Sequence, residues 1–392
     1  MLIAHGEQLV VKAEVFDRNG NFSRSIFANN TASPQPHEIE LIHRNVNGDI
    51  INTKSIPFRS FTANWAIFQY QNWSNAAFAY LNTAGASGTS HLSEVYIDCP
   101  YNNDNGGIQV GRSSSSPTVS DYGLTTKIAN GVTTNQLDYS ATVFEAPTYV
   151  APYYSMTIRR VFTNYSGANV TVRETGIVGN TSSTFVTTAG YLLAHDTVDY
   201  NGDAINLIIG HEQSFEVKYK FRYDISSGFT SNYLKYLYAW MDTGNKNYDL
   251  IMTNGAVTAN PSVQAKCGGY VLTTAGTYGT NTTGIVVGKG TAVAQYTDFQ
   301  MDDTISHGST TGKLLYGGQE YNVPVVDATG TYYSLKRAFV NDSAVAVDIT
   351  EAGIIGTDEG AQNILHTHIN FTGLTLQPTE SVRIIFTFRT DV

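Results

Sequence analysis

The chain has 392 residues, which is enough for two or three domains with cores of their own. Charged residues make up only 14% of it, against roughly 25% in a typical soluble protein, and the 25 Tyr and 18 Phe favour strands over helices. The net charge of −10 and the lack of Lys/Arg clusters exclude the basic footprint of a nucleic-acid-binding protein. No apolar run reaches the roughly 18 residues of a membrane span. The first residues lack the pattern of a signal peptide, so we expect none.

Residues 1–59 contain two β-hairpin signals. "VKAEVFDRNGNFSRSIF" predicts strands on either side of Asn19-Gly20, and "IELIHRNVNGDIINTKSI" predicts them around Asn47-Gly48. Asn-Gly is the preferred pair of a two-residue hairpin turn. Two hairpins precede two repeats, and we therefore expect each hairpin to supply edge strands to one repeat.

From about residue 60 the sequence occurs twice. "VTVRETGIVG" from Val170 matches "VDITEAGIIG" from Val347, and the same offset aligns the residues from Ile108 with those from Ile285. Shorter offsets extend the match upstream to "FTANW" and "FTSNY", and downstream to "SFEVKYKFRYDI" and "SVRIIFTFRTDV". We predict an N-terminal β-hairpin region (residues 1–59), a first copy (60–226) and a second copy (227–392).

Each copy is expected to open with a helix. The second copy carries apolar residues at helical spacing: Phe229, Tyr233, Leu237 and Trp240. Thr230 or Ser231 is the expected N-cap, and the first copy repeats the pattern more weakly from Phe61. Strands follow a turn-rich passage. The alternation in "SFEVKYKFRYDI" from Ser214 predicts a half-buried antiparallel strand.

Four phrases within the copies suggest turns and loops. We expect "TIRRVFTN" and "NVTVRETGIVG" to form a hairpin around "YSGA", with the Glu-x-Gly phrase ending a core strand. "GGIQVG" from Gly106 and "GTYGTNTTG" from Gly276 lack the Gly-Lys-Ser/Thr of a phosphate loop and are interpreted as loops between strands. "YNNDNGG" from Tyr101 lacks the terminal Glu of a calcium loop, so a turn is expected.

Glu174 and Glu351 occupy equivalent places, with Arg160 and Arg337 across the expected hairpin. One interpretation is a carboxylate for acid–base catalysis, and the other is a cross-strand Arg–Glu pair that fixes strand register. A single carboxylate in each copy lacks the partner that glycoside hydrolysis requires. We therefore favour the ion pair.

Histidines offer one candidate metal site. His366 and His368 would share one face of a strand, so both could bind a metal ion. The first copy aligns Ala194 with His366, however, and no third ligand is evident. His195 and His211 are expected to be solvated or singly hydrogen-bonded.

The cysteines and tyrosines suggest no chemistry of their own. Cys99 and Cys267 are too few for a disulfide framework and lack metal-ligand spacing. Tyrosines in "APTYVAPYYS" from Ala146, and Tyr332 and Tyr333 in the second copy, suit either a sugar-stacking platform or an interface, and we favour a core or interface role. We predict no catalytic, cofactor-binding or metal-binding residues.

Ordered phrases of the chain resemble a known family. These are "IELIHRNVNGDIINTKSIPFRSFTANW", "FTSNYLKYLYAWM", "GIVVGKGTAVAQYTDFQMDDTI", "GKLLYGG", "YSLKRAFVNDSAVAVDITEAGIIG" and "RIIFTFRTDV". They are similar to virion structural proteins of tailed bacteriophages, a mostly uncharacterised family, over residues 37–392 and with the family module present twice. The family has no known active site, so the resemblance assigns none here.

The expected fold class is all-β: two tandem antiparallel β-sandwich (jelly-roll-like) domains, each preceded by a short helix, plus the N-terminal hairpins. The resemblance implies a non-enzymatic component of a phage head surface, collar or tail. Such a protein would be made in the host cytoplasm and would bind other virion proteins and copies of itself. Alternatives are an adhesin for a receptor or host-surface glycan, a tandem jelly-roll capsid shell protein, and a glycan depolymerase. We expect no cofactor, nucleic-acid or membrane partner.

Overall fold

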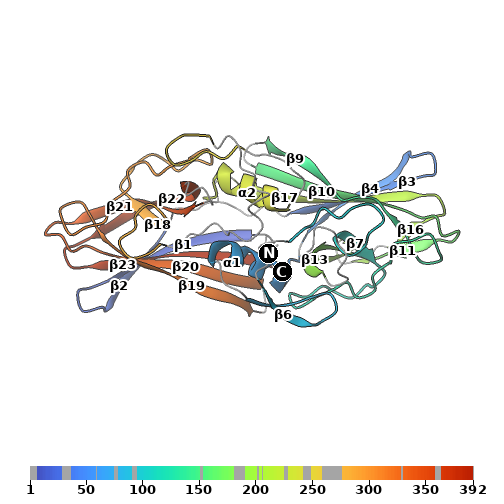
Figure 1. The fold of residues 1–392 in the computed structure, drawn as a ribbon, viewed down its shortest axis with the longest axis horizontal. Helices are drawn as coiled ribbons and strands as arrows, with labels where there is room; N and C mark the ends of the chain where they lie inside the picture. The colour runs from blue at the N-terminus through green and yellow to red at the C-terminus, as the bar shows by residue number, and fades with distance from the viewer. Residues whose placement is uncertain are drawn as a thin grey trace.

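The computed structural model is an elongated molecule built mostly of antiparallel strands (Figure 1). Among the described residues, helix is confined to two short segments near the middle of the molecule. This confirms the expected all-β class. The structure describes residues 7–28, 37–58, 60–74, 78–90, 95–150, 153–180, 190–200, 203–204, 206–224, 228–241, 249–257, 276–327, 330–357 and 363–391.

Both predicted N-terminal hairpins are present. The first pairs β1 (Glu7–Phe16) with β2 (Phe22–Phe27), and the second pairs β3 (Glu38–Arg44) with β4 (Ile50–Pro57). Gly20 and Gly48 have φ of +80° and +85°. Glycine adopts this left-handed conformation without the steric cost that a Cβ atom brings. Neither Asn19 nor Asn47 shares it, and the loops span residues 17–21 and 45–49, so both turns are longer than the predicted two-residue turn.

Two large antiparallel sheets occupy opposite ends of the molecule (Figure 1). Their remaining strands are β8 (Asp138–Tyr139), β9 (Val143–Val150), β10 (Tyr153–Thr163), β17 (Ser214–Asp224), β19 (Leu315–Asp327), β20 (Gly330–Val340) and β23 (Ser381–Asp391). One sheet has the order β4-β3-β17-β10-β8, with β9 also paired to β10, and the other has the order β19-β20-β23-β1-β2. The first hairpin therefore extends the sheet of the second copy and the second hairpin that of the first copy. This confirms that each hairpin supplies strands to one repeat.

Strand β17 shows how the sequence pattern produces burial. Phe215, Val217, Tyr219 and Phe221 are all buried, as their alternation predicts. On the other face Glu216 binds Arg159 of the neighbouring β10 at 2.9 Å. One face of this strand therefore contributes to the core and the other carries cross-strand ion pairs.

A smaller three-stranded sheet is present in each copy. The first contains β7 (Gly107–Gly111), β12 (Glu174–Gly179) and β13 (Tyr191–Thr197), and the second contains β18 (Gly284–Gly288), β21 (Val347–Thr357) and β22 (Asn363–Leu376). Three two-stranded ribbons complete the described strands: β5 (Phe78–Leu81) with β6 (Ser87–Ser90), β11 (Val170–Val172) with β16 (Leu207–Ile209), and β14 (Asp199–Tyr200) with β15 (Asp203–Ala204). In matching register, Ile177 pairs with Ile108 and Ile354 with Ile285.

Three local predictions from the phrases were wrong. "GGIQVG" contains β7, a buried strand of the small sheet of the first copy, rather than a loop. The Glu-x-Gly phrase begins β12 and lies in the middle of β21, so it ends neither strand. The "YSGA" segment does not close a hairpin, because β10 pairs within the large sheet whereas β11 pairs with β16.

The side chain of Asn164 explains this change of sheet. Its amide donates to the carbonyls of Ala168 and Ile209, each at 2.7 Å, and its oxygen accepts from the Ser166 N–H at 2.9 Å. These bonds satisfy backbone groups that a hairpin ladder would otherwise pair. In contrast, "YNNDNGG" begins with the expected turn at Tyr101.

The two helices are α1 (Ala63–Ser74) and α2 (Ser231–Met241). Thr230 caps α2, since its hydroxyl oxygen accepts from the Tyr233 N–H at 3.5 Å. The same hydroxyl donates to the Leu365 carbonyl at 2.7 Å, and Thr62 makes the matching bond to the Leu192 carbonyl before α1. Each helix therefore starts from the small sheet of its own copy.

Each helix also contacts the other copy. Helix α1 packs on β19 and β20, where the rings of Tyr70 and Tyr333 lie 5.7 Å apart. From α2, the Tyr238 hydroxyl donates to the Glu145 carbonyl of β9 at 2.5 Å, and its ring contacts Phe144. The helices thereby join the two halves of the molecule through an aromatic interior.

Candidate functional site

The most concentrated polar chemistry in the first copy is a buried cluster of two carboxylates and one imidazole. His195, on β13, lies 2.6 Å from Asp121 through Nδ1 and 3.0 Å from Glu174 through Nε2. The His195 side chain is 1% exposed and the Glu174 side chain 0%. Strand pairing places these two residues on neighbouring strands, and a loop supplies Asp121.

The second copy contains a matching cluster. His368, on β22, lies 2.5 Å from Asp298 through Nδ1 and 2.8 Å from Glu351 through Nε2. The same ring nitrogens face equivalent carboxylates in both halves. Glu174 with Glu351 and Asp121 with Asp298 are pairs that the sequence alignment also matches.

Backbone N–H groups hold each buried glutamate. Glu174 accepts from Ser113, Thr125 and Thr126 at 2.8–3.1 Å. Glu351 likewise accepts from three loop N–H groups at 2.9–3.1 Å. A Cβ added at Gly111 would lie 2.3 Å from the Glu174 carboxylate, so this position requires glycine for a steric reason. Each carboxylate thereby binds the backbone of a long loop to the small-sheet strand that carries the glutamate.

These contacts determine the charge of both histidines. Burial would lower the pKa of His195, but hydrogen bonds and Coulombic attraction from Asp121 and Glu174 outweigh it and raise that pKa to about 9. The same balance raises the pKa of His368 to about 9. The glutamate pKa values are lowered despite burial, because the imidazole and the N–H groups favour the ionised form. Each cluster is therefore an ion triad at neutral pH.

Arginines form a second matched pair of polar clusters. Arg160 donates to five backbone carbonyls at 2.5–3.3 Å, including Ile108 of β7, and lies over the Tyr139 ring at 4.8 Å. Arg337 repeats this with five carbonyls and the Tyr316 ring at 4.9 Å. Burial lowers the pKa of Arg337 to about 10. The predicted Arg–Glu pair is therefore wrong, because these arginines bind carbonyls and the glutamates bind histidines.

The prediction that His195 is solvated or singly bonded was also wrong. His211 fits it better: its side chain is half exposed, and its Nδ1 accepts from the Gly167 N–H at 3.2 Å. The alignment could have revealed the Glu and Asp members of each cluster. It could not easily reveal the histidines, since His195 and His368 fall outside the constant offset that matches the carboxylates.

His366 and His368 have different surroundings. His366 is packed edge-on against Trp73 and Tyr233, within 5.6 and 6.2 Å between ring centres, and neither of its ring nitrogens has a hydrogen-bond partner among the described residues. Burial lowers its pKa to about 3. The strand register aligns it with Leu193, not with Ala194. Within the described ranges, no group of three or more His, Cys, Asp or Glu side chains is arranged to hold a metal ion.

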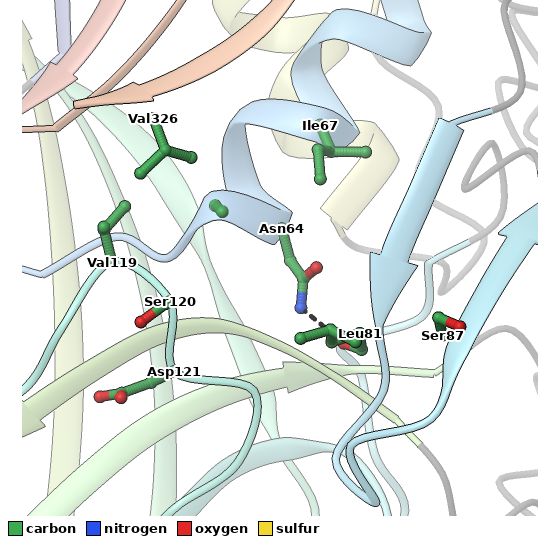
Figure 2. A pocket seen from close by; sticks show the side chains of 9 residues that line it. Asn64, Ile67, Leu81, Ser87, Val119, Ser120, Asp121 and Val326 are labelled. Atoms are coloured by element: carbon green, nitrogen blue, oxygen red, sulfur yellow. Dashed lines mark hydrogen bonds between the residues drawn. The ribbon is translucent and has the colours of Figure 1, made fainter.

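A cavity of about 230 Å³ lies beside the first cluster (Figure 2). Its lining combines four polar residues, Asn64, Ser87, Ser120 and Asp121, with five apolar ones, Ala63, Ile67, Leu81, Val119 and Val326. Figure 2 shows Val119 and Val326 on one side and Ile67 across from them. Because Val326 belongs to β19, the cavity lies where the two copies meet.

The cysteines and tyrosines considered from the sequence either make contacts inside the protein or lie outside the described residues. Cys99 is a buried free thiol whose pKa is raised by burial, and Cys267 lies outside the described residues. Tyr149, Tyr154 and Tyr333 all make ring contacts within the molecule.

Comparisons of the chain with family models, with curated proteins and with solved structures give no match. Neither described helix has the length and apolar character needed to cross a membrane.

Proposed function

We propose that the chain is a non-enzymatic structural component of a bacteriophage virion, at the head surface, collar or tail. In this proposal each copy folds as an antiparallel, jelly-roll-like β-sandwich, and the sandwiches assemble into a symmetric oligomer with other virion proteins. The resemblance described above motivates the assignment to a virion. The contacts between sheets and the character of the sheet edges support a structural role.

Polar side chains that connect the large and small sheets support the sandwich. In the first copy Arg160 extends from β10 to the Ile108 carbonyl of β7 at 3.0 Å. Arg337 makes the matching bond from β20 to the Ile285 carbonyl of β18 at 2.9 Å. Both large side chains are 1% exposed, so each connects two sheets through a buried layer. This is the arrangement expected where two sheets face each other.

The observation that carries the proposed function is a matched pair of apolar sheet edges. Strands β2 and β4 are the outermost strands of their sheets, and Figure 1 shows them at opposite ends of the molecule. Phe22 and Phe27 of β2 are 58% and 59% exposed, and Ile50 and Ile51 of β4 are 56% and 53% exposed. Exposed apolar edge strands are sites of pairing between chains. One chain therefore offers two assembly surfaces, which suits a repeating shell, collar or tube.

The buried clusters are consistent with this role. The side chains of Glu174 and Glu351 are fully buried, and each accepts hydrogen bonds from backbone N–H groups and pairs with a histidine. The arrangement is the same in both copies. Such triads stabilise long loops, and a virion component must keep these loops ordered in the assembled particle.

The test uses the phage whose genome encodes the chain. Purified particles are expected to contain it in many copies. A variant carrying Ile50→Lys and Ile51→Lys is expected to fold normally, because both side chains are exposed, yet to enter particles at least tenfold less. The control variant Val132→Lys alters a residue of similar exposure, 57%, away from both edges, and should enter normally. Absence of the wild-type chain from purified particles would overturn the proposal.

A further inference from the structure

The cavity beside Asp121 lies at a junction, the place where a loop of one copy meets a strand of the other copy. The other half of the molecule has an equivalent junction. Strand register establishes the correspondence: Tyr149 of β9 pairs with Tyr154, and Val326 of β19 pairs with Thr331. Tyr154 and Thr331 are matched by the constant offset between the copies, so Val326 stands in the place of Tyr149.

The loops at the two junctions correspond as well. At the start of α2 the Ser231 N–H donates to the Tyr296 carbonyl at 2.7 Å, and at the start of α1 the Ala63 N–H donates to the Val119 carbonyl at 2.8 Å. Val119 therefore stands in the place of Tyr296. At both junctions a loop of one copy faces the last strand residues of the other.

Aromatic rings fill one junction and leave the other open. Tyr296 stacks on Tyr149 with ring centres 5.0 Å apart and planes 15° apart, and Tyr154 lies 6.3 Å from Tyr296. At the equivalent junction two valines, Val119 and Val326, replace the stacked pair. The cavity of about 230 Å³ lies against both of these valines.

We propose that this cavity is a binding site for a single phenol-type aromatic ring. A dry cavity of about 150 Å³ lined by apolar side chains is large enough to bind benzene, so the present volume holds a ring with a small substituent. Val119, Val326 and Ile67 supply apolar walls for the ring (Figure 2). Asn64 and Asp121 also line the cavity, but the Asn64 amide already donates to the Leu81 carbonyl and the Asp121 carboxylate already binds His195, so the apolar walls hold the ring. The site would thereby reproduce, with a ligand, the packing that two tyrosines supply at the other junction.

This proposal is independent of the virion role and is tested on the purified 392-residue chain. The probe is p-cresol, the side chain of tyrosine, titrated by isothermal calorimetry. The wild-type chain is expected to bind one equivalent. Val326→Tyr fills the cavity from a half-exposed position and is expected to weaken binding at least tenfold while the protein stays folded by circular dichroism. The double variant Tyr149→Val, Tyr296→Val opens the second junction and should bind two equivalents.

Two further probes establish how the ring is presented. A blocked Gly-Tyr-Gly peptide that also binds in a Val326-dependent way assigns the site to a tyrosine of another chain. Binding of p-cresol without the peptide assigns it to a free small phenol. The proposal would be overturned if the wild-type chain bound no p-cresol at p-cresol concentrations on the order of 10 mM. It would also be overturned if the wild-type chain and Val326→Tyr bound p-cresol equally well.

Discussion

The ion triads predict a specific dependence of stability on pH. Because the pKa of His368 in the folded chain is about 9, against 6.5 for an ordinary histidine, the folded state binds its proton more tightly than the unfolded state does. The stabilisation is fully present below pH 6.5 and is lost as the pH rises through 9. A difference of this size corresponds to about 3 kcal/mol in total, of which about 2 kcal/mol disappears between pH 7 and pH 9.

The perturbation is His368→Gln, measured by urea unfolding at a series of pH values. Glutamine cannot carry the charge, and Glu351 and Asp298 lose their cationic partner. We expect a loss of about 3–5 kcal/mol at pH 7, as for other broken buried ion pairs, and a shallower decline toward pH 9 than in the wild-type chain. His211→Gln, at an exposed position, is the control and should follow the wild-type curve. If His368→Gln and wild type declined in parallel between pH 7 and pH 9, the assignment of a charged, buried imidazole would be refuted.

Three other substitutions test the contacts that build the fold, each by urea unfolding at pH 7. Arg337→Lys keeps the charge but has too few donors for five carbonyls, and should cost about 2–4 kcal/mol; a loss below about 0.5 kcal/mol would contradict the carbonyl-binding role. Asn164→Ala leaves the Ala168 and Ile209 carbonyls without their donor and should cost about 1–3 kcal/mol, and an unchanged midpoint would argue against it. Gly20→Ala forces a Cβ into a positive-φ turn and should cost about 1–2 kcal/mol, whereas Gly318→Ala, which has free space and no positive φ, should be nearly neutral.

Local patterns in the sequence were sufficient to predict local structure. The Asn19-Gly20 turn, the alternating strand from Ser214 and the helix capped by Thr230 are all present, because each depends on neighbouring residues alone. The alignment of the two copies also predicted which carboxylates would be equivalent, since Glu174 and Glu351 hold matching loops.

Long-range pairing was not predictable in the same way. The segment around Asn164 has turn chemistry that fits a hairpin equally well, and only the pairing of β11 with β16 shows that the chain changes sheets. Partners of buried charges depend on residues far apart in the chain. Glu174 and Arg160 lie near each other in sequence, but each binds backbone groups of distant loops. The aromatic junction of Tyr149 and Tyr296 likewise exists only because the two copies meet.

The central claim, that this chain is a repeating structural part of a virion, is tested most directly by an electron-microscopy map of the intact particle at side-chain resolution. We expect density for both copies at symmetry-related positions, with β2 or β4 in contact with a neighbouring chain. A particle map with no density for the chain, or with both edge strands facing solvent, would contradict it.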